Sequence, residues 1–166
     1  MTAMPAASGA RTVEIEDRCE AVSFNAAIGP GTCVGDGDVT FAEFAAVLNP
    51  FDFGHEHWRF QFGRGRIDRG ERLKAANDGG EFHTFTEVAE YGGGCVAELN
   101  EPLALTPVAE CDAVTEVAPG VFVPTAFITT GIDPGDTLDV PGLKAGEHKF
   151  MCLIHPWMRV DVEVRK

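Results

Sequence analysis

The sequence has no apolar run of the roughly 18 to 20 residues that cross a membrane. Its first ten residues, MTAMPAASGA, lack the charged head and apolar middle of a signal peptide. Lys and Arg are absent from residues 75 to 143, a stretch that carries twelve carboxylates. The formal net charge of −13 argues against binding to nucleic acid or anionic membranes, which require clustered cations. It permits docking on a basic partner, although an acidic surface can also serve solubility alone.

Motifs of the common enzyme classes are missing as well. The chain has no Gly-x-Ser-x-Gly elbow, and FGRGRIDRG lacks the Gly-Lys-Ser/Thr of a phosphate-binding loop. Cys152 with His155 as its base would form a nucleophile pair. Reactive thiols usually lie at a helix start or beside cations, however, and apolar residues flank Cys152. We therefore predict that the protein is not an enzyme.

Five cysteines form two spaced pairs and one single residue. Cys19 and Cys33 flank a Gly/Pro-rich region, Cys95 and Cys111 flank a second loop, and Cys152 stands alone. The simplest arrangement is two local disulfides, each worth about 3 kcal/mol for a loop of this size, and one free thiol. Spacing alone leaves other connectivities open. Disulfides indicate an oxidising compartment, so we expect a periplasmic, cell-surface or secreted protein.

Short strands separated by turns dominate the pattern. Stretches such as TVEIED, WRFQF and RVDVEVR alternate apolar and polar residues, which is typical of half-buried strands. Turn signals such as DPGD and KAG separate them. Seven or eight such strands predict an all-β sandwich, which we assign to residues 51–166. A loop from residue 91 to 119 is irregular and is predicted to be an insertion over one end of this domain.

Residues 1–50 have too few apolar positions to form a core of their own. We expect them to form an N-terminal extension that packs on the sandwich. Thr40 and Glu43 make a capping-box pattern before FAEFAAVL, which predicts a short helix in this extension.

Two further stretches carry weaker metal-binding patterns. GDGDVTFAEF resembles the second half of an EF-hand loop, with Glu43 at the bidentate position, but Thr32 and Val34 stand where early oxygen ligands belong. A turn followed by a capped helix explains this stretch better. His55 and His57 would point the same way on a strand, but the sequence places no further donors beside them.

The stretch FMCLIHPWM holds three metal donors at a spacing of three, Cys152, His155 and Met158. A thiolate, two imidazoles and a weak thioether suit copper in a trigonal site with a long axial bond, whereas zinc sites more often show paired cysteines. The second imidazole must come from elsewhere, and His83, just after the turn NDGG, is the best candidate. The alternative is that Cys152 and Met158 are core residues and His155 is a surface histidine.

Beyond the donors themselves, FMCLIHPWMRVDVEV resembles the copper loop of the cupredoxins, or blue copper proteins, and its short Cys-x2-His-Pro-x-Met-Arg form is most like that of amicyanin and plastocyanin. RIDRGERLKAANDGGEFHTF and IDPGDTLDVPGLKAGEHKFMC resemble the strands that lead to the family's first His and to its Cys. The resemblance covers about residues 58–88 and 121–166. It implies a Greek-key β-sandwich with one type 1 copper ion that transfers single electrons between redox partners.

The same resemblance implies a role for each donor. His83, Cys152 and His155 would be the strong equatorial copper ligands, and Met158 would be the weak axial ligand. The amide of Thr84 would bond the sulfur of the cysteine.

The resemblance also implies how partners meet the protein. Trp157 beside His155 would give an apolar patch through which electrons enter or leave. Redox partner proteins would dock there or, as the net charge permits, on the acidic surface.

Two other roles on the same fold remain open at this point. A copper-handling or storage protein would bind Cu(I) tightly and would draw extra ligands from His55, His57 or His148. A nitrite- or oxygen-reducing module would need a second copper cluster with several more histidines, and the five in this chain are too few.

Overall fold

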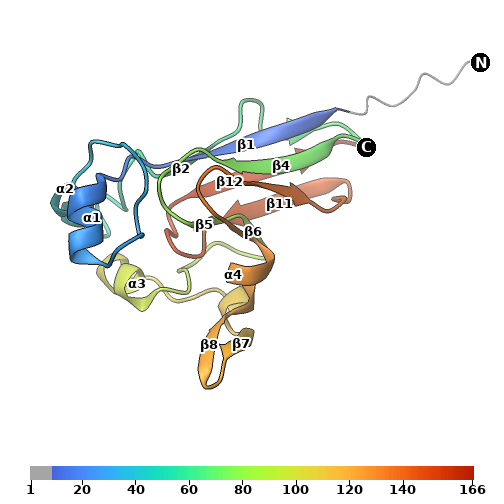
Figure 1. The fold of residues 1–166 in the computed structure, drawn as a ribbon. Helices are drawn as coiled ribbons and strands as arrows, with labels where there is room; N and C mark the ends of the chain where they lie inside the picture. Colours follow the sequence, from blue (N-terminus) through green and yellow to red (C-terminus); the bar gives the residue numbers. More distant parts are fainter. Residues whose placement is uncertain (1–8) are drawn as a thin grey trace, which may run out of the picture.

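Two four-stranded sheets pack face to face in this computed structural model, which describes residues 9–166 (Figure 1). One sheet has the order β10-β4-β1-β2 and the other β3-β12-β11-β6. The strands are β1 (Ala10–Glu16), β2 (Arg59–Gln61), β3 (Arg66–Ile67), β4 (Arg72–Asn77), β6 (Thr86–Val88), β10 (Thr137–Val140), β11 (Gly146–Met151) and β12 (Arg159–Val164). The predicted β-sandwich is confirmed.

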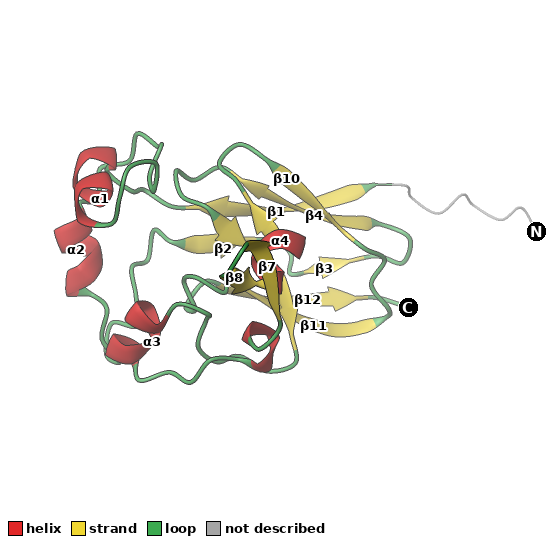
Figure 2. Ribbon diagram, turned by 60° about the horizontal axis from the view of Figure 1, so that its bottom comes forward, coloured by secondary structure: helices red, strands yellow, loops and turns green. Residues whose placement is uncertain are grey.

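Most of the remaining elements lie at the left end of the sandwich or below it in Figure 1, and the turned view of Figure 2 brings α4, β7 and β8 in front of the strands. The remaining elements are α1 (Ala21–Ala27), α2 (Phe41–Ala46), β5 (His83–Thr84), α3 (Ala97–Leu103), the 3-10 helix η1 (Ala109–Cys111), β7 (Val114–Ala118), β8 (Val121–Pro124), α4 (Thr125–Thr129) and β9 (Gly131–Ile132). None of these helices has the length and apolar character needed to cross a membrane.

The core lies between the two sheets because alternate residues of each strand point inward. Val13 and Ile15 of β1 are fully buried. Val162 of β12 is also fully buried, and Phe150 of β11 is 2% exposed. These side chains belong to one continuous apolar cluster that also holds Cys152. The sandwich therefore builds its core directly beneath the predicted metal loop.

Strand β1 is an inner strand although it lies within the predicted extension. It pairs parallel with β4 and antiparallel with β2. The division of the chain at residue 50 stays a prediction. Strand β1, which lies before that boundary, is part of the sandwich.

A cap formed by residues 17–57 covers the end of the sandwich at the left of Figure 1, and it contains α1 and α2. The predicted short helix is α2: Thr40 Oγ1 accepts from Glu43 N (3.3 Å), and the Glu43 carboxylate accepts from Thr40 N. Helix α1 was not predicted. Its N-cap is Glu20, an unusual capping residue, and Phe24 is its one buried side chain.

Both predicted disulfides form. Cys19–Cys33 fastens the cap and Cys95–Cys111 closes the insertion, while Cys152 is free and buried. The insertion holds α3 and η1 and leads into the β7–β8 hairpin, which projects from the body at the bottom of Figure 1. The stretch GVFVPTAFITT divides into β8 and α4, and the last turn of α4 is closed by Thr130 N donating to Ala126 O (2.9 Å).

Aromatic packing holds the cap to the sandwich. Phe24 stacks on Trp58 with ring centroids 5.7 Å apart, and Phe44 lies 4.8 Å from Trp58. All three side chains are at most 2% exposed. Burial of rings this large makes the cap a cooperative part of the fold rather than a loose appendage.

We expect Phe24→Ala to lower the free energy of unfolding by about 3–5 kcal/mol, because it leaves a cavity among buried rings. The matched control is Phe51→Ala, since Phe51 lies in the same cap but is 95% exposed, and its change should stay within about 0.5 kcal/mol. Urea unfolding followed by tryptophan fluorescence measures both. Equal losses in the two variants would contradict the packing described above.

Candidate metal centre

Three predicted ligands, His83, Cys152 and His155, meet at the end of the sandwich beneath the cap. Their donor atoms lie within 4.8 Å of one another, and all three side chains are buried. Cys152 Sγ lies 3.8 Å from Nδ1 of His83 and 3.8 Å from Nδ1 of His155. A thiol and two imidazole nitrogens thus face a common point, and this donor set suggests a copper site.

The local chain path explains how the donors converge. His83 opens β5, and Cys152 follows the last residue of β11. The chain then turns back: Met158 N donates to His155 O (2.9 Å), and Cys152 N donates to Met158 O (3.0 Å). Pro156 in this turn fixes one backbone angle. The Met158 side chain is 1% exposed and belongs to the same core cluster as Cys152.

The cysteine sulfur is held by neighbouring polar groups. Thr84 N donates to Cys152 Sγ (3.4 Å), and Thr84 Oγ1 accepts from Leu153 N (2.8 Å). Burial raises the pKa of the Cys152 thiol, but the imidazoles of His155 and His83 outweigh burial and hold that pKa well below its usual range. The site therefore favours the thiolate, which is the form that binds metals.

A buried carboxylate fixes the orientation of His83. Asp17 Oδ2 lies 2.8 Å from His83 Nε2, and both side chains are fully buried. The same carboxylate accepts from the amides of Cys19, Gly80 and Glu81 at 3.0–3.1 Å. With Nε2 donating to Asp17, Nδ1 is left as the free donor atom. This is the carboxylate–histidine pairing that orients metal-binding imidazoles in proteins.

The charges of this pair follow from those contacts. Burial raises the pKa of Asp17, but the hydrogen bonds from His83 and from the backbone lower it to about 2. Burial lowers the pKa of His83, but its bonds to Asp17 and Cys152 raise it to about 9. Gly79 lets the backbone lie close to the Asp17 carboxylate, because a Cβ at this position would lie 2.1 Å from Asp17 Oδ2.

A second buried carboxylate lies behind the other imidazole. Glu81 Oε2 accepts from Trp58 Nε1 (2.6 Å) and lies 3.7 Å from His155 Nε2. Burial raises the pKa of Glu81, although His155 and the bond from Trp58 oppose that rise. Each candidate imidazole ligand thus has a carboxylate near its outer nitrogen.

The cap covers much of the surface that was predicted to be an open patch. Phe44 lies 6.1 Å from the ring of His155 and 5.8 Å from that of Trp157. Trp157 Nε1 donates to His55 O (3.2 Å), and the Trp157 ring packs so closely on Gly54 that a Cβ there would lie 2.2 Å from it. Trp157 is half-buried and His155 is 3% exposed. The patch expected beside His155 is therefore enclosed on the Trp157 side.

Other candidate donors do not join the cluster. His148 lies 2.6 Å from Glu87 Oε1 and 2.8 Å from Lys144 O, and the rings of His55 and His57 face each other 5.4 Å apart. Within residues 9–166 the other close donor group, Asp17, Cys19 and Glu81, includes a disulfide sulfur and an already bonded carboxylate.

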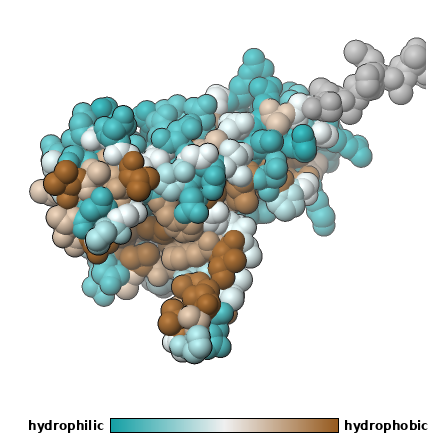
Figure 3. Space-filling view, in the orientation of Figure 1, coloured by the Kyte–Doolittle hydropathy of each residue, from teal (hydrophilic) through white to brown (hydrophobic). Residues whose placement is uncertain are grey.

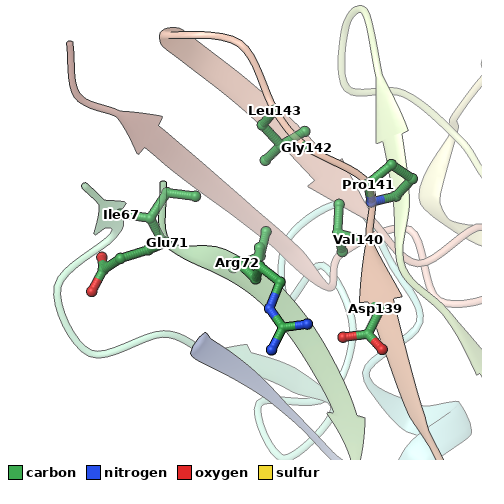
Figure 4. Close-up of a pocket in the computed structure, with 9 residues that line it drawn as sticks. Ile67, Glu71, Arg72, Asp139, Val140, Pro141, Gly142 and Leu143 are labelled. Atoms are coloured by element: carbon green, nitrogen blue, oxygen red, sulfur yellow. The ribbon is translucent and has the colours of Figure 1, made fainter. Parts of the chain in front are cut away.

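A hollow at the opposite end of the sandwich is lined by Ile67, Leu73 and Asp139 among others, and has a volume of about 340 Å³ (Figure 4). It contains no sulfur or imidazole donor. Within the described residues, both close groups of metal donors lie at the capped end.

Asp17 and Glu81 were not singled out from the sequence. Asp17 is separated from His83 by 66 positions, so no local spacing links them. Glu81 stands two residues before His83, and an acidic residue this close to a predicted ligand was the signal that the sequence offered.

We expect Asp17→Asn to lower the free energy of unfolding by about 3 kcal/mol, because it breaks a buried charged pair and turns an amide group toward backbone donors. Asp36→Asn is the matched control, since Asp36 is exposed in the same cap and should change stability by less than about 0.5 kcal/mol. Urea unfolding of the metal-free protein tests the pair. Indistinguishable variants would show that the Asp17 contacts do not stabilise the fold.

No protein-family model matches this sequence, and no curated protein sequence matches it. Among solved structures, a similar chain is described as "Novel Purple Cupredoxin from Nitrosopumilus maritimus", with 17% sequence identity, a TM-score of 0.38, and coverage of 93% of this chain and 98% of that chain. At this identity and TM-score the likeness carries no argument. Inference about function therefore rests on the side-chain geometry described above. The chain resembles the cupredoxins in its metal-loop sequence, its sandwich and its His-Cys-His cluster.

Proposed function

We propose that this protein is a type 1 copper electron carrier that works outside the cytoplasm. The observation that carries this proposal is the buried convergence of one thiol and two imidazole Nδ1 atoms within 4.8 Å. Copper supplies a one-electron couple between Cu(I) and Cu(II) at such a donor set. His83, Cys152 and His155 are the strong ligands in this proposal.

The remaining predicted residues hold and adjust the site. Met158 is the weak axial ligand, supported by its burial at the end of the loop that begins at Cys152. The Thr84 amide withdraws charge from the sulfur through its hydrogen bond. A core in which side chains are already packed and hydrogen-bonded limits rearrangement when an electron arrives, because the ligands cannot relax into a new geometry.

The two carboxylates influence the reduction potential. Asp17 and Glu81 both lie against the outer nitrogens of the imidazoles in a region of low exposure. Negative charge close to a buried metal stabilises the more positive oxidation state. We infer that they favour Cu(II) and lower the reduction potential relative to a site without them.

Location and partner chemistry follow from the surface. Two disulfides point to an oxidising compartment. The net charge of −13 favours redox partners with a basic docking face. Partner proteins approach the acidic surface in this proposal, since the cap encloses the Trp157 side of the site.

The storage role gains no support from the geometry. His148 is engaged by Glu87 and by the Lys144 carbonyl, and neither His55 nor His57 lies in the donor group at Cys152. The extra Cu(I) ligands that a storage site would need are therefore not assembled within residues 9–166.

We expect the purified protein to bind one copper per chain and to show intense visible absorption from charge transfer between the thiolate and Cu(II). Cys152→Ser should abolish this colour, whereas His57→Ala should retain it because His57 lies outside the donor group. Metal analysis and a visible spectrum provide the test. A copper-loaded but colourless protein, or a coloured Cys152→Ser variant, would refute the proposed site.

Met158→Leu should retain the colour and raise the reduction potential, because a weak donor to Cu(II) is replaced by an apolar group. A tenfold change in relative preference for the two oxidation states corresponds to about 59 mV, and we expect a rise of that order. Voltammetry on both proteins measures it. Unchanged potentials would remove Met158 from the ligand set and leave it as a core residue.

A further inference from the structure

A pocket of about 650 Å³ opens between the cap and α3, and its wall includes His155. Phe41, Phe44 and Leu99 give it an apolar lining, while Glu81 supplies a carboxylate. Its volume falls in the range of small-molecule sites, which are mostly apolar with a few fixed polar groups. Figure 3 shows apolar residues gathered around the cap on this side of the molecule.

The carboxylate in this pocket is built into the structure. The Glu81 side chain is 7% exposed, and its Oε2 is occupied by Trp58 Nε1. Its Oε1 accepts no hydrogen bond from any side chain or amide in residues 9–166. No side-chain oxygen within residues 9–166 is both buried and unpaired, so Oε1 is accessible, and a ligand hydroxyl group in the pocket can donate to it.

The charge of the pocket selects among ligands. No Lys or Arg lines it, while Glu81 and Glu98 both do, so anions are repelled. A cation would lose its hydration against the apolar walls. A flat uncharged molecule with one hydroxyl donor fits both conditions, since its ring packs on Phe41, Phe44 and Leu99.

We propose that this pocket binds a small uncharged phenol or hydroquinone, and that the bound molecule donates electrons to the metal site through His155. The second part rests on the proposed function, whereas the binding itself does not. The ring of the ligand would lie against the imidazole of His155, whose Nδ1 is 3.8 Å from Cys152 Sγ.

The electron and proton of this donation balance. One electron leaves the hydroquinone for Cu(II), which becomes Cu(I). The hydroxyl proton passes to solvent at the mouth of the pocket, and a neutral semiquinone radical leaves the pocket. Glu81 would hold the ligand by accepting its hydrogen bond, and the pocket provides access to His155 on a side that Trp157 does not close.

Binding is tested first on the metal-free protein, with 4-methoxyphenol as the probe and NMR shifts as the readout. We expect a dissociation constant below about 1 mM, as suits a ligand of this size, and at least tenfold weaker binding of 1,4-dimethoxybenzene, which has the same ring but no hydroxyl donor. Equal binding of the two, or no shifts at residues that line the pocket, would overturn the proposal.

A pair of neighbouring substitutions localises the site. Ala27 lines the pocket at the end of α1 and Ala26 does not, and both are exposed. Ala27→Trp should weaken 4-methoxyphenol binding at least tenfold, while Ala26→Trp should leave it unchanged. Identical affinities in the two variants would place the ligand elsewhere and refute the pocket.

Electron donation is then measured as bleaching of the copper(II) colour by 1,4-hydroquinone. The rate should saturate with hydroquinone concentration and fall at least tenfold in Ala27→Trp but not in Ala26→Trp. A colourless copper-loaded protein would refute the proposed function and leave the binding result intact. A coloured protein that binds no phenol, or whose two variants bleach at one rate, would refute this inference alone.

Discussion

The contact between Asp17 and His83 links the sandwich, the cap and the candidate metal site. Asp17 follows β1, an inner strand of the sandwich, and precedes the disulfide that fastens the cap. Its carboxylate holds the imidazole and also gathers the amides of Gly80 and Glu81. Sheet, cap and candidate metal site therefore share one buried charge, and a change at any of the three alters the free energy of the other two.

The cap shields the candidate metal site from solvent more completely than an uncovered metal loop would. Aromatic rings and Glu81 shield His155 almost completely, and the imidazole also lines the pocket beside α3. Shielding lowers the local dielectric, which strengthens the influence of each nearby charge on the metal. In the proposed function, the same residues, chiefly Glu81 and Phe44, would set both access to the metal and its reduction potential.

Sequence patterns predicted the parts whose information is local. Cys152 and His155 are three residues apart in one turn, and the disulfides close short loops. The position of Asp17 could not be predicted, because it depends on the register of β1 against β4, in which Ile15 pairs with Asn77. Helix α1 was missed since its cap is a glutamate, and the cover over Trp157 depends on packing between segments about 100 residues apart.

The chain distances between these contacts imply an order of assembly. The cap disulfide joins residues 14 apart, whereas Cys152 meets His83 across 69 positions. Contacts distant in sequence form late because closing a long loop costs entropy. The donor triad therefore forms only once His83 and Cys152 have been brought together across this separation. A metal held by all three donors reports complete folding, and its binding free energy appears as resistance to unfolding.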